Sequence, residues 1–252
     1  MSSVVKEKPY FSLITVSYNS GETIERTIKS VLNQSCKDFE YIIVDGASTD
    51  STMDIVKKYE KIFENSNIKF RVTSEPDKGI YDAMNKGIRM SSGILIGIVN
   101  SDDYYTDHAL EDVKNVADLN PDIGIFHGIM REFDEGGTVR YIGYSSSVLP
   151  QKMIPHPTCF IRKKVYEENG LYDDSLKYAA DYDYILRANK KGVKFLLLES
   201  VISNFSLMGV SQNSSKAFRE GLKVRKNYHV EKRISLLFCY IKYIILKYRR
   251  KH

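Results

Sequence analysis

The chain has 252 residues, of which 42% are hydrophobic and 27% charged, and its formal net charge is +5. This length and composition are those of a folded soluble protein with one substantial core, and they exclude a disordered chain. The three cysteines are odd in number, far apart and without CxxC spacing, which argues against a disulfide framework or a zinc site and indicates a reducing compartment.

Basic residues are concentrated near the carboxyl end. Residues 216–252 contain 12 Lys and Arg but only 2 Asp and Glu, whereas the preceding part contains 25 basic and 30 acidic residues. A mildly acidic body with a strongly basic tail predicts that the two parts meet different partners.

Strand and helix patterns alternate over the first 120 residues. Apolar, strand-like runs occupy residues 11–18, 40–46, 68–76 and 94–100. Apolar residues on one helical face occupy residues 19–34, 48–63, 79–90 and a stretch around Leu110. This alternation predicts an α/β fold with a mainly parallel sheet covered by helices on both faces.

Beyond residue 120 the pattern changes to a mixed or antiparallel region. Strands are predicted at 123–130, 138–145 and 194–205, and short helices at 162–170 and 181–192. We expect one domain over residues 1–212, followed by a basic, amphipathic helical tail over residues 213–252.

Polar segments follow each of the first four predicted strands, at residues 17–19, 45–50, 75–79 and 100–103. In parallel α/β sheets, ligands bind beyond the carboxyl ends of the strands. Three of these four ends carry acids, and their convergence on one edge predicts a ligand site.

The adjacent acids Asp102 and Asp103 end a buried strand. One such Asp would be explained as a helix cap, but a pair is better explained by a divalent cation. Mg and Mn bind through one or two carboxylates together with substrate phosphates, so the pair predicts a nucleotide diphosphate. Neither GxGxxG nor GxxxxGK[ST] is present, which argues against a dinucleotide fold or a P-loop.

Asp45 could accept a hydrogen bond from a nucleobase or a ribose hydroxyl, or simply form a turn before Gly46. The segment from Ser74 to Gly87 mixes acids, lysines and an asparagine, which would suit a phosphate or, equally, a solvated helix face.

Five stretches together resemble the family 2 inverting glycosyltransferases of the GT-A, Rossmann-like fold: TVSYN, YIIVDGASTD, EPDKGIYDAMNKGI, SGILIGIVNSDD and AADYDYILRA. The resemblance covers roughly residues 10 to 212 and is closest to the bacterial O-antigen and capsule polysaccharide branch. It implies a UDP-sugar donor, a Mn or Mg ion, and inversion at the anomeric carbon.

The resemblance also implies roles for individual residues. It assigns nine residues to binding of the UDP-sugar donor: Val16, Ser17, Tyr18, Asp45, Asp77, Lys78, Gly79, Asn85 and Asp102. Asp103 and Asp102 would hold the metal, Asp102 would also reach towards the ribose and diphosphate, and Asp181 would be the catalytic base. The chain departs from the family pattern at Gly46, where a second Asp is usual, and at Ala180, where a Glu is usual.

Two further side chains lie close to these motifs. Asp183 follows Asp181 by two residues, so on a helix it would point elsewhere (~200° round) and would cap or orient rather than act as the base. His156, between two prolines, could line the acceptor pocket or be a structural histidine.

The leading functional hypothesis is transfer of a hexose or N-acetylhexosamine from a UDP-sugar to a polyprenyl-diphosphate-linked saccharide in cell-surface polysaccharide synthesis. One alternative is a sugar nucleotidyltransferase, which would need a glycine-rich loop that SYNSGET does not provide. Another is a nucleotide-sugar or glycan-binding module without turnover, against which the retained acids argue. Nucleic-acid binding is not expected, because the tail lacks a recognised module.

The tail contains ISLLFCYIKYIIL, residues 234–246, which is shorter than the ~20 residues that a spanning helix needs. Cationic segments flank it on both sides, as in helices that lie on anionic lipid. We therefore expect a cytoplasmic protein, peripheral at the inner face of the cell membrane. The alternative is a helix docked on the domain's own core.

Overall fold

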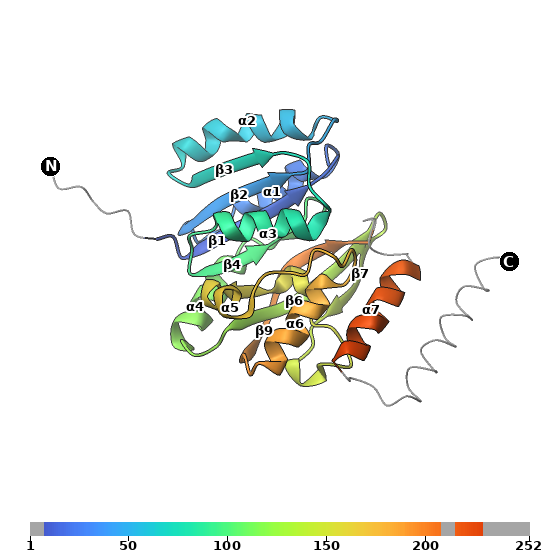
Figure 1. Ribbon diagram of the computed structural model, residues 1–252. Helices are drawn as coiled ribbons and strands as arrows, with labels where there is room; N and C mark the ends of the chain where they lie inside the picture. Colours follow the sequence, from blue (N-terminus) through green and yellow to red (C-terminus); the bar gives the residue numbers. More distant parts are fainter. Residues whose placement is uncertain (1–7, 208–214, 229–252) are drawn as a thin grey trace.

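The computed structural model describes residues 8–207 and 215–228. Its first half alternates strands with helices, as the sequence predicts (Figure 1). The strands are β1 (Phe11–Ser17), β2 (Phe39–Asp45), β3 (Lys69–Ser74) and β4 (Leu95–Ile98), and the helices are α1 (Ile24–Leu32), α2 (Thr52–Asn65) and α3 (Ile80–Met90). β1 pairs in parallel with β2 and β4, and β2 pairs in parallel with β3.

The second half is mixed. It contains the strands β5 (Tyr104–Tyr105), β6 (Ile125–Asp134), β7 (Gly137–Ile142), β8 (Phe160–Arg162) and β9 (Phe195–Ser206). Its helices are α4 (Ala109–Leu119), α5 (Lys163–Asn169), α6 (Ala180–Lys190) and α7 (Ser215–Asn227), with short 3-10 turns η1 (Ser146–Val148) and η2 (His156–Thr158). β8 is antiparallel to β4 and β6, while β6 and β9 are parallel.

All these described strands form one sheet in the order β3-β2-β1-β4-β8-β6-β9-β5, with β7 paired to β6 outside that path. The two-residue strand β5, which the sequence does not reveal, pairs antiparallel with β9. That pairing brings the end of β4 next to the end of β9, two segments separated by about a hundred residues. The mixed α/β sheet confirms the predicted fold class.

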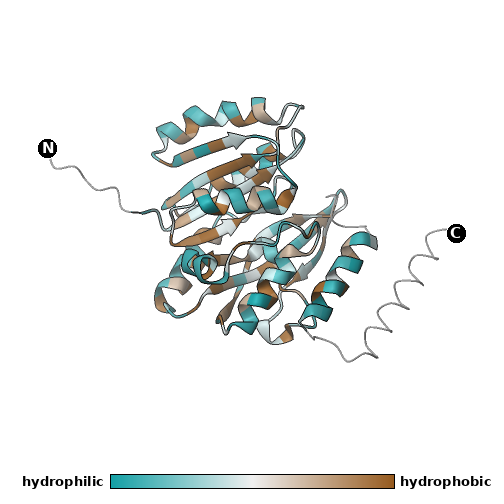
Figure 2. Cartoon of the chain, in the orientation of Figure 1, coloured by the Kyte–Doolittle hydropathy of each residue, from teal (hydrophilic) through white to brown (hydrophobic). Residues whose placement is uncertain are grey.

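Two apolar cores lie on the two faces of the sheet. Alternate residues of a strand point to opposite faces, so in β1 Leu13 packs with α1 and α2, whereas Ile14 packs with α3. Because both faces are covered, every residue of β1 and β2 is buried, which explains their nearly continuous apolar sequences. Figure 2 shows this concentration of hydrophobic residues in the central strands.

The predicted tail is described only for residues 215–228. There α7 packs beside α6 (Figure 1), and its Val224 is buried in the core on that face of the sheet. None of the helices within the described ranges has the length and apolarity to cross a membrane. The predicted interfacial segment, residues 234–246, lies outside the described residues.

Glu40 on β2 is a buried carboxylate that links several elements. Its oxygens accept hydrogen bonds from the Ser12 hydroxyl at 2.7 Å, from the Ser92 hydroxyl at 2.7 Å and from the Arg71 guanidinium at 2.9 Å. Burial raises its pKa, but these hydrogen bonds and the Arg71 charge outweigh burial, so the pKa of Glu40 is lowered.

We expect Glu40→Gln to lower the free energy of unfolding at pH 7 by about 1–3 kcal/mol, because an amide cannot accept from all these donors. A lowered pKa gives stability that is fully present above the unfolded value near 4.5 and is lost as pH falls through the folded pKa. The difference in the free energy of unfolding between wild type and variant, measured by urea denaturation, should therefore become smaller at acid pH. The exposed Glu60→Gln is the control, and a Glu40 effect no larger than the Glu60 effect would contradict this assignment.

Candidate functional site

A cavity of about 1130 Å³ opens at the carboxyl ends of β1 and β4 and beside the amino-terminal ends of α3 and α6. It is lined by segments far apart in the sequence, at residues 16–23, 76–84, 100–102, 177–181 and 205–206. This is the sheet edge at which the polar strand ends predict a ligand.

The end of β1 supplies one wall. Val16, Ser17 and Tyr18 all line the cavity, and the Tyr18 ring is 66% exposed. A Cβ added at Gly46 would lie 2.6 Å from the Asp77 carboxylate and 3.3 Å from the Tyr18 ring. Glycine at position 46 therefore lets Asp77 and Tyr18 approach the backbone closely.

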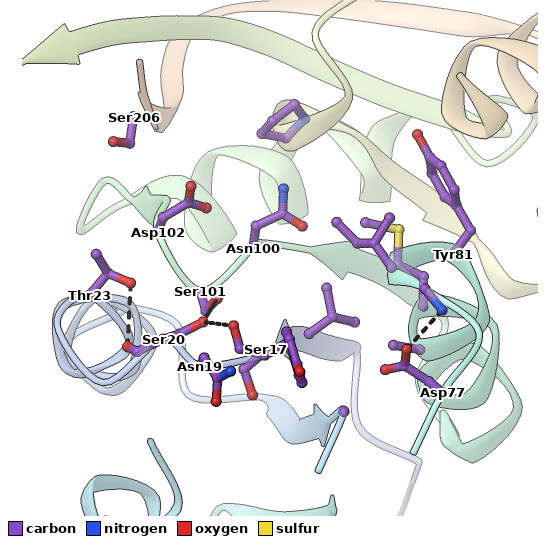
Figure 3. A pocket seen from close by; sticks show the side chains of 18 of the residues that line it. Ser17, Asn19, Ser20, Thr23, Asp77, Tyr81, Asn100, Ser101, Asp102 and Ser206 are labelled. Atoms are coloured by element: carbon purple, nitrogen blue, oxygen red, sulfur yellow. Dashed lines mark hydrogen bonds between the residues drawn. The ribbon is translucent and has the colours of Figure 1, made fainter. Parts of the chain in front are cut away.

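Asp77 lies on the loop before α3 and accepts a hydrogen bond from the Gly79 amide at 2.8 Å (Figure 3). Gly79, which precedes the first residue of α3, has a φ of 128°, a conformation that favours glycine. Both residues line the cavity, as the prediction that they bind the sugar donor requires.

Asp45 is not among the residues that line the cavity. It is fully buried at the end of β2, where it accepts hydrogen bonds from the hydroxyls of Ser17, Ser48 and Ser74 at 3.0, 2.5 and 2.7 Å. These bonds join the ends of β1, β2 and β3. The predicted contact between Asp45 and a nucleoside stays a prediction.

The adjacent acids after β4 point in different directions. Asp102 lines the cavity (Figure 3), and burial raises the pKa of its carboxyl group. Asp103 is completely buried, and one of its oxygens accepts a hydrogen bond from the Ser206 amide at 2.9 Å. Burial, and then the Asp102 charge, raise the pKa of Asp103 well above its usual range. The predicted contact between Asp103 and a metal stays a prediction.

The residues that do face the cavity fit a hard divalent cation. Asn100 and Asp102 lie together on the loop after β4 (Figure 3), and the buried side-chain oxygen of Asn100 has no hydrogen-bond partner. Amide and carboxylate oxygens suit Mg and Mn, which complete their coordination with water and substrate phosphates. Within residues 8–207 and 215–228 no group of three or more His, Cys, Asp or Glu could hold a metal by itself.

Asp181 occupies the first turn of α6 and lines the cavity. Its Oδ1 atom accepts hydrogen bonds from the Tyr81 hydroxyl at 3.0 Å and from the Tyr182 amide at 2.8 Å. Burial, and then the Asp181 charge, raise the pKa of Tyr81, which keeps its hydroxyl protonated as a donor. Both bonds use Oδ1, and neither is made to Oδ2.

A second cavity, of about 310 Å³, adjoins the first. The two share His156, Pro157, Asp181 and Phe205 in their linings, and the second is otherwise lined mainly by β6, β7 and the segment before η2. His156 lies in η2 and its Nε2 is 2.8 Å from the Tyr172 hydroxyl. Burial lowers the pKa of His156, so the ring is neutral at pH 7.

Three residues that the sequence analysis singled out do not line either cavity: Lys78, Asn85 and Asp183. Asn85 exchanges two hydrogen bonds with the backbone of Tyr172, at 2.9 and 3.0 Å. Asn85 therefore holds α3 to the segment before α6. Asp183 accepts a hydrogen bond from Tyr228 at 3.1 Å, away from both cavities, as its helical offset from Asp181 predicts.

Two residues near Asp181 were not predicted. Tyr81 lies inside a motif that the sequence does reveal, but its contact depends on how α3 meets α6. Glu220 on α7 accepts hydrogen bonds from three successive amides just before Asp181, those of Lys177, Tyr178 and Ala179. No local pattern indicates Glu220, because its partners lie about forty residues earlier in the chain.

Comparison with known proteins gives a family match over most of this fold. Residues 12–170 match the family described as Glycosyl transferase family 2. The hyaluronan synthase of Pasteurella multocida is 26% identical over 232 residues, which are 90% of this chain and 23% of that protein. The chondroitin synthase of Escherichia coli is 27% identical over 233 residues, again 90% of this chain and 32% of that protein. The chain thus spans about a quarter to a third of these relatives' length.

Solved structures share the fold. TarS residues 1–349 from S. aureus, in complex with UDP-GlcNAc, is 20% identical with a TM-score of 0.68, covering 86% of this chain and 65% of that one. The mannosyltransferase PcManGT from Pyrobaculum calidifontis, in complex with GDP-Man and Mn²⁺, is 15% identical with a TM-score of 0.67, covering 90% and 66%.

Proposed function

Because the chain belongs to glycosyl transferase family 2, we propose that it transfers a hexose or N-acetylhexosamine from a UDP-sugar to a saccharide acceptor, with inversion at the anomeric carbon. One observation supports this most strongly: Asp181 lies where the two cavities join. A donor in the larger cavity and an acceptor in the smaller one would meet at this carboxylate. The larger cavity has the size of a pocket for a ligand such as a nucleotide sugar.

The nucleoside would bind along the end of β1. The exposed Tyr18 ring offers a face on which a base could stack, and the Asp77 carboxylate lies beside it. At Gly46 the chain lacks the second acid that the family pattern has, and Asp77 occupies the space next to this glycine. We assign the hydrogen bond to a ribose hydroxyl to Asp77. Complexes of TarS with UDP and UDP-GlcNAc support the choice of a UDP-sugar.

Asp102 and Asn100 would hold a Mn or Mg ion against the donor diphosphate. This differs from the expected use of Asp103, which is completely buried and accepts the Ser206 amide through one of its oxygens. When bound, the cation would offset the negative charge that grows on the leaving diphosphate. The Mn²⁺ in the PcManGT complex supports a divalent cation in this fold.

Asp181 would act as the general base. An acceptor hydroxyl in the smaller cavity gives its proton to Asp181 Oδ2 while its oxygen forms a bond to the anomeric carbon. The bond from that carbon to the diphosphate oxygen breaks, and UDP leaves with the electron pair. Attack on the face opposite the leaving group inverts the anomeric carbon. Tyr81, by donating to Oδ1, fixes the orientation of the carboxylate.

The acceptor would be a growing cell-surface polysaccharide on a polyprenyl diphosphate, as in O-antigen or capsule synthesis. The similarity to hyaluronan and chondroitin synthases supports a polysaccharide product. A lipid-linked acceptor would give the basic tail a purpose, because attachment to the cytoplasmic face of the membrane confines enzyme and acceptor to one surface.

The exposed face of α7 supports attachment at a membrane. It carries four exposed cationic side chains at helical spacing, Lys216, Arg219, Lys223 and Lys226. These residues recur at intervals of three and four, which places them on one side of the helix. Figure 2 shows that α7 is mostly hydrophilic.

Asp181→Asn should lower turnover by roughly 10²–10⁴-fold while UDP affinity stays within twofold of wild type, because the amide keeps the shape but cannot take a proton. UDP release from a panel of UDP-sugars measures turnover, and calorimetry measures affinity. Undiminished turnover would move the base role to another group. A wild-type protein that binds UDP but releases none from any UDP-sugar would instead favour a binding module without turnover.

Asp102→Ala should weaken Mn²⁺-dependent UDP binding about tenfold or more, because it removes the carboxylate that faces the diphosphate. Asp103→Asn should keep Mn²⁺-dependent binding within about threefold of wild type, because its nearly isosteric amide oxygen can still accept the Ser206 amide. Calorimetry with UDP, with and without Mn²⁺, compares the two variants. The reverse ranking would restore Asp103 as the metal ligand.

Truncation after Tyr228 should leave UDP release intact but reduce binding to phosphatidylcholine vesicles that contain phosphatidylglycerol. This site keeps α7, whereas truncation at residue 212 would also remove Glu220 and Val224 from the domain. Co-sedimentation at two salt concentrations measures the binding, and neutral vesicles serve as the control. Equal binding of the full-length and truncated proteins would contradict a membrane role for residues 229–252.

A further inference from the structure

Glu220 binds the backbone of the segment that leads into α6. Its Oε1 atom accepts the Lys177 amide at 3.0 Å, and its Oε2 atom accepts the amides of Tyr178 and Ala179 at 2.5 and 2.9 Å. Hydrogen bonds from amides to an ionised carboxylate are stronger than those between neutral groups. Three successive amides bound to one carboxylate therefore fix this segment firmly.

Glu220 lies at the amino-terminal end of α6, where the helix has no side-chain cap. Ala179 is the N-cap residue of α6 and has no side chain that could accept from the first turn. Glu220 binds the amide of the N-cap residue Ala179 and the two amides before it, which brings its carboxylate from α7 to this end of the helix. An anion near a helix amino terminus interacts favourably with the helix dipole.

The held segment is part of the candidate site. Lys177, Tyr178 and Asp181 all line the larger cavity, and Asp181 follows Ala179 by two residues. The backbone that Glu220 binds therefore sets the position of the Asp181 main chain, while the hydrogen bond from Tyr81 sets the orientation of its carboxylate.

Glu220 is not needed merely to hold α7 in place. Val224, one helical turn further on, is 1% exposed in the core, and Tyr228, a second turn on, donates a hydrogen bond to Asp183 at 3.1 Å. The docking of α7 thus has other contacts, and Tyr228 offers a matched control: its hydroxyl also links α7 to α6, but it binds Asp183 and not the amides of residues 177–179.

We propose that Glu220 is a positioning residue for the general base: it holds the segment 177–179 so that Asp181 stands at the junction of the two cavities. This inference rests on the proposed function only for its effect on turnover. Its effect on the backbone is independent of any reaction.

The experiment compares Glu220→Gln with Tyr228→Phe in the full-length chain. Glu220→Gln keeps the shape but turns an amide nitrogen, itself a donor, towards backbone donors. We expect kcat for UDP release to fall tenfold to a hundredfold, as misplacement of a catalytic group by about 1 Å does, with KM for the UDP-sugar and calorimetric UDP affinity within twofold. Tyr228→Phe should leave kcat within twofold.

Hydrogen exchange of the peptide containing residues 177–182 provides the second measurement. It should become at least tenfold faster in Glu220→Gln and stay unchanged in Tyr228→Phe. Unchanged exchange in Glu220→Gln, or an unchanged kcat in an active enzyme, would overturn the proposal. Equal losses of kcat in both variants would also overturn it, since they would reflect the docking of α7 alone. If the wild type released no UDP, the proposed function would fail, and the exchange rates would still decide whether Glu220 holds the segment.

Discussion

The site depends on how two adjacent carboxylates at the end of β4 are kept apart. Asp102 and Asp103 repel each other, and two neighbouring anions in a poorly solvated place cannot both remain without partners. Asp103 turns into the interior and accepts the amide of Ser206, the last residue of β9. This bond ties the parallel half of the sheet to the mixed half. Asp102 is left facing the cavity between them, with Asn100 beside it.

Asp45, like Asp103, points into the protein and not into the cavity. The direction of such a side chain could not be predicted from the sequence. The fold class could be predicted from the spacing of apolar residues, because buried strands and helices with one buried face each leave a distinct pattern in the sequence. Among the site residues, Tyr18, Asp77 and Asp181 line the cavity as predicted. Asp45 did not, because an acid after a strand has the same local signature whether it turns outward or inward. Its direction is set by hydroxyl donors such as Ser74, which lies on another strand.

Residues that act on Asp181 come from two other places in the chain, which is why the sequence revealed only the acid itself. Tyr81 reaches its Oδ1 atom from α3, and Glu220 fixes its backbone from α7. The family pattern has an acid directly before this position, where the chain has Ala180. A carboxylate is nevertheless present at the start of α6, because α7 delivers Glu220 there. The sequence around Asp181 thus lacks one acid of the family pattern, but the folded structure places another carboxylate, that of Glu220, close by.

The geometry of α7 allows one helix to serve two purposes. Glu220, Val224 and Tyr228 recur every four residues and form the face that contacts α6 and the segment before it. The four exposed cations, Lys216, Arg219, Lys223 and Lys226, form a second stripe beside this face. Because these cations are exposed while Glu220 is bound to amides, an anionic surface could attract them without displacing Glu220.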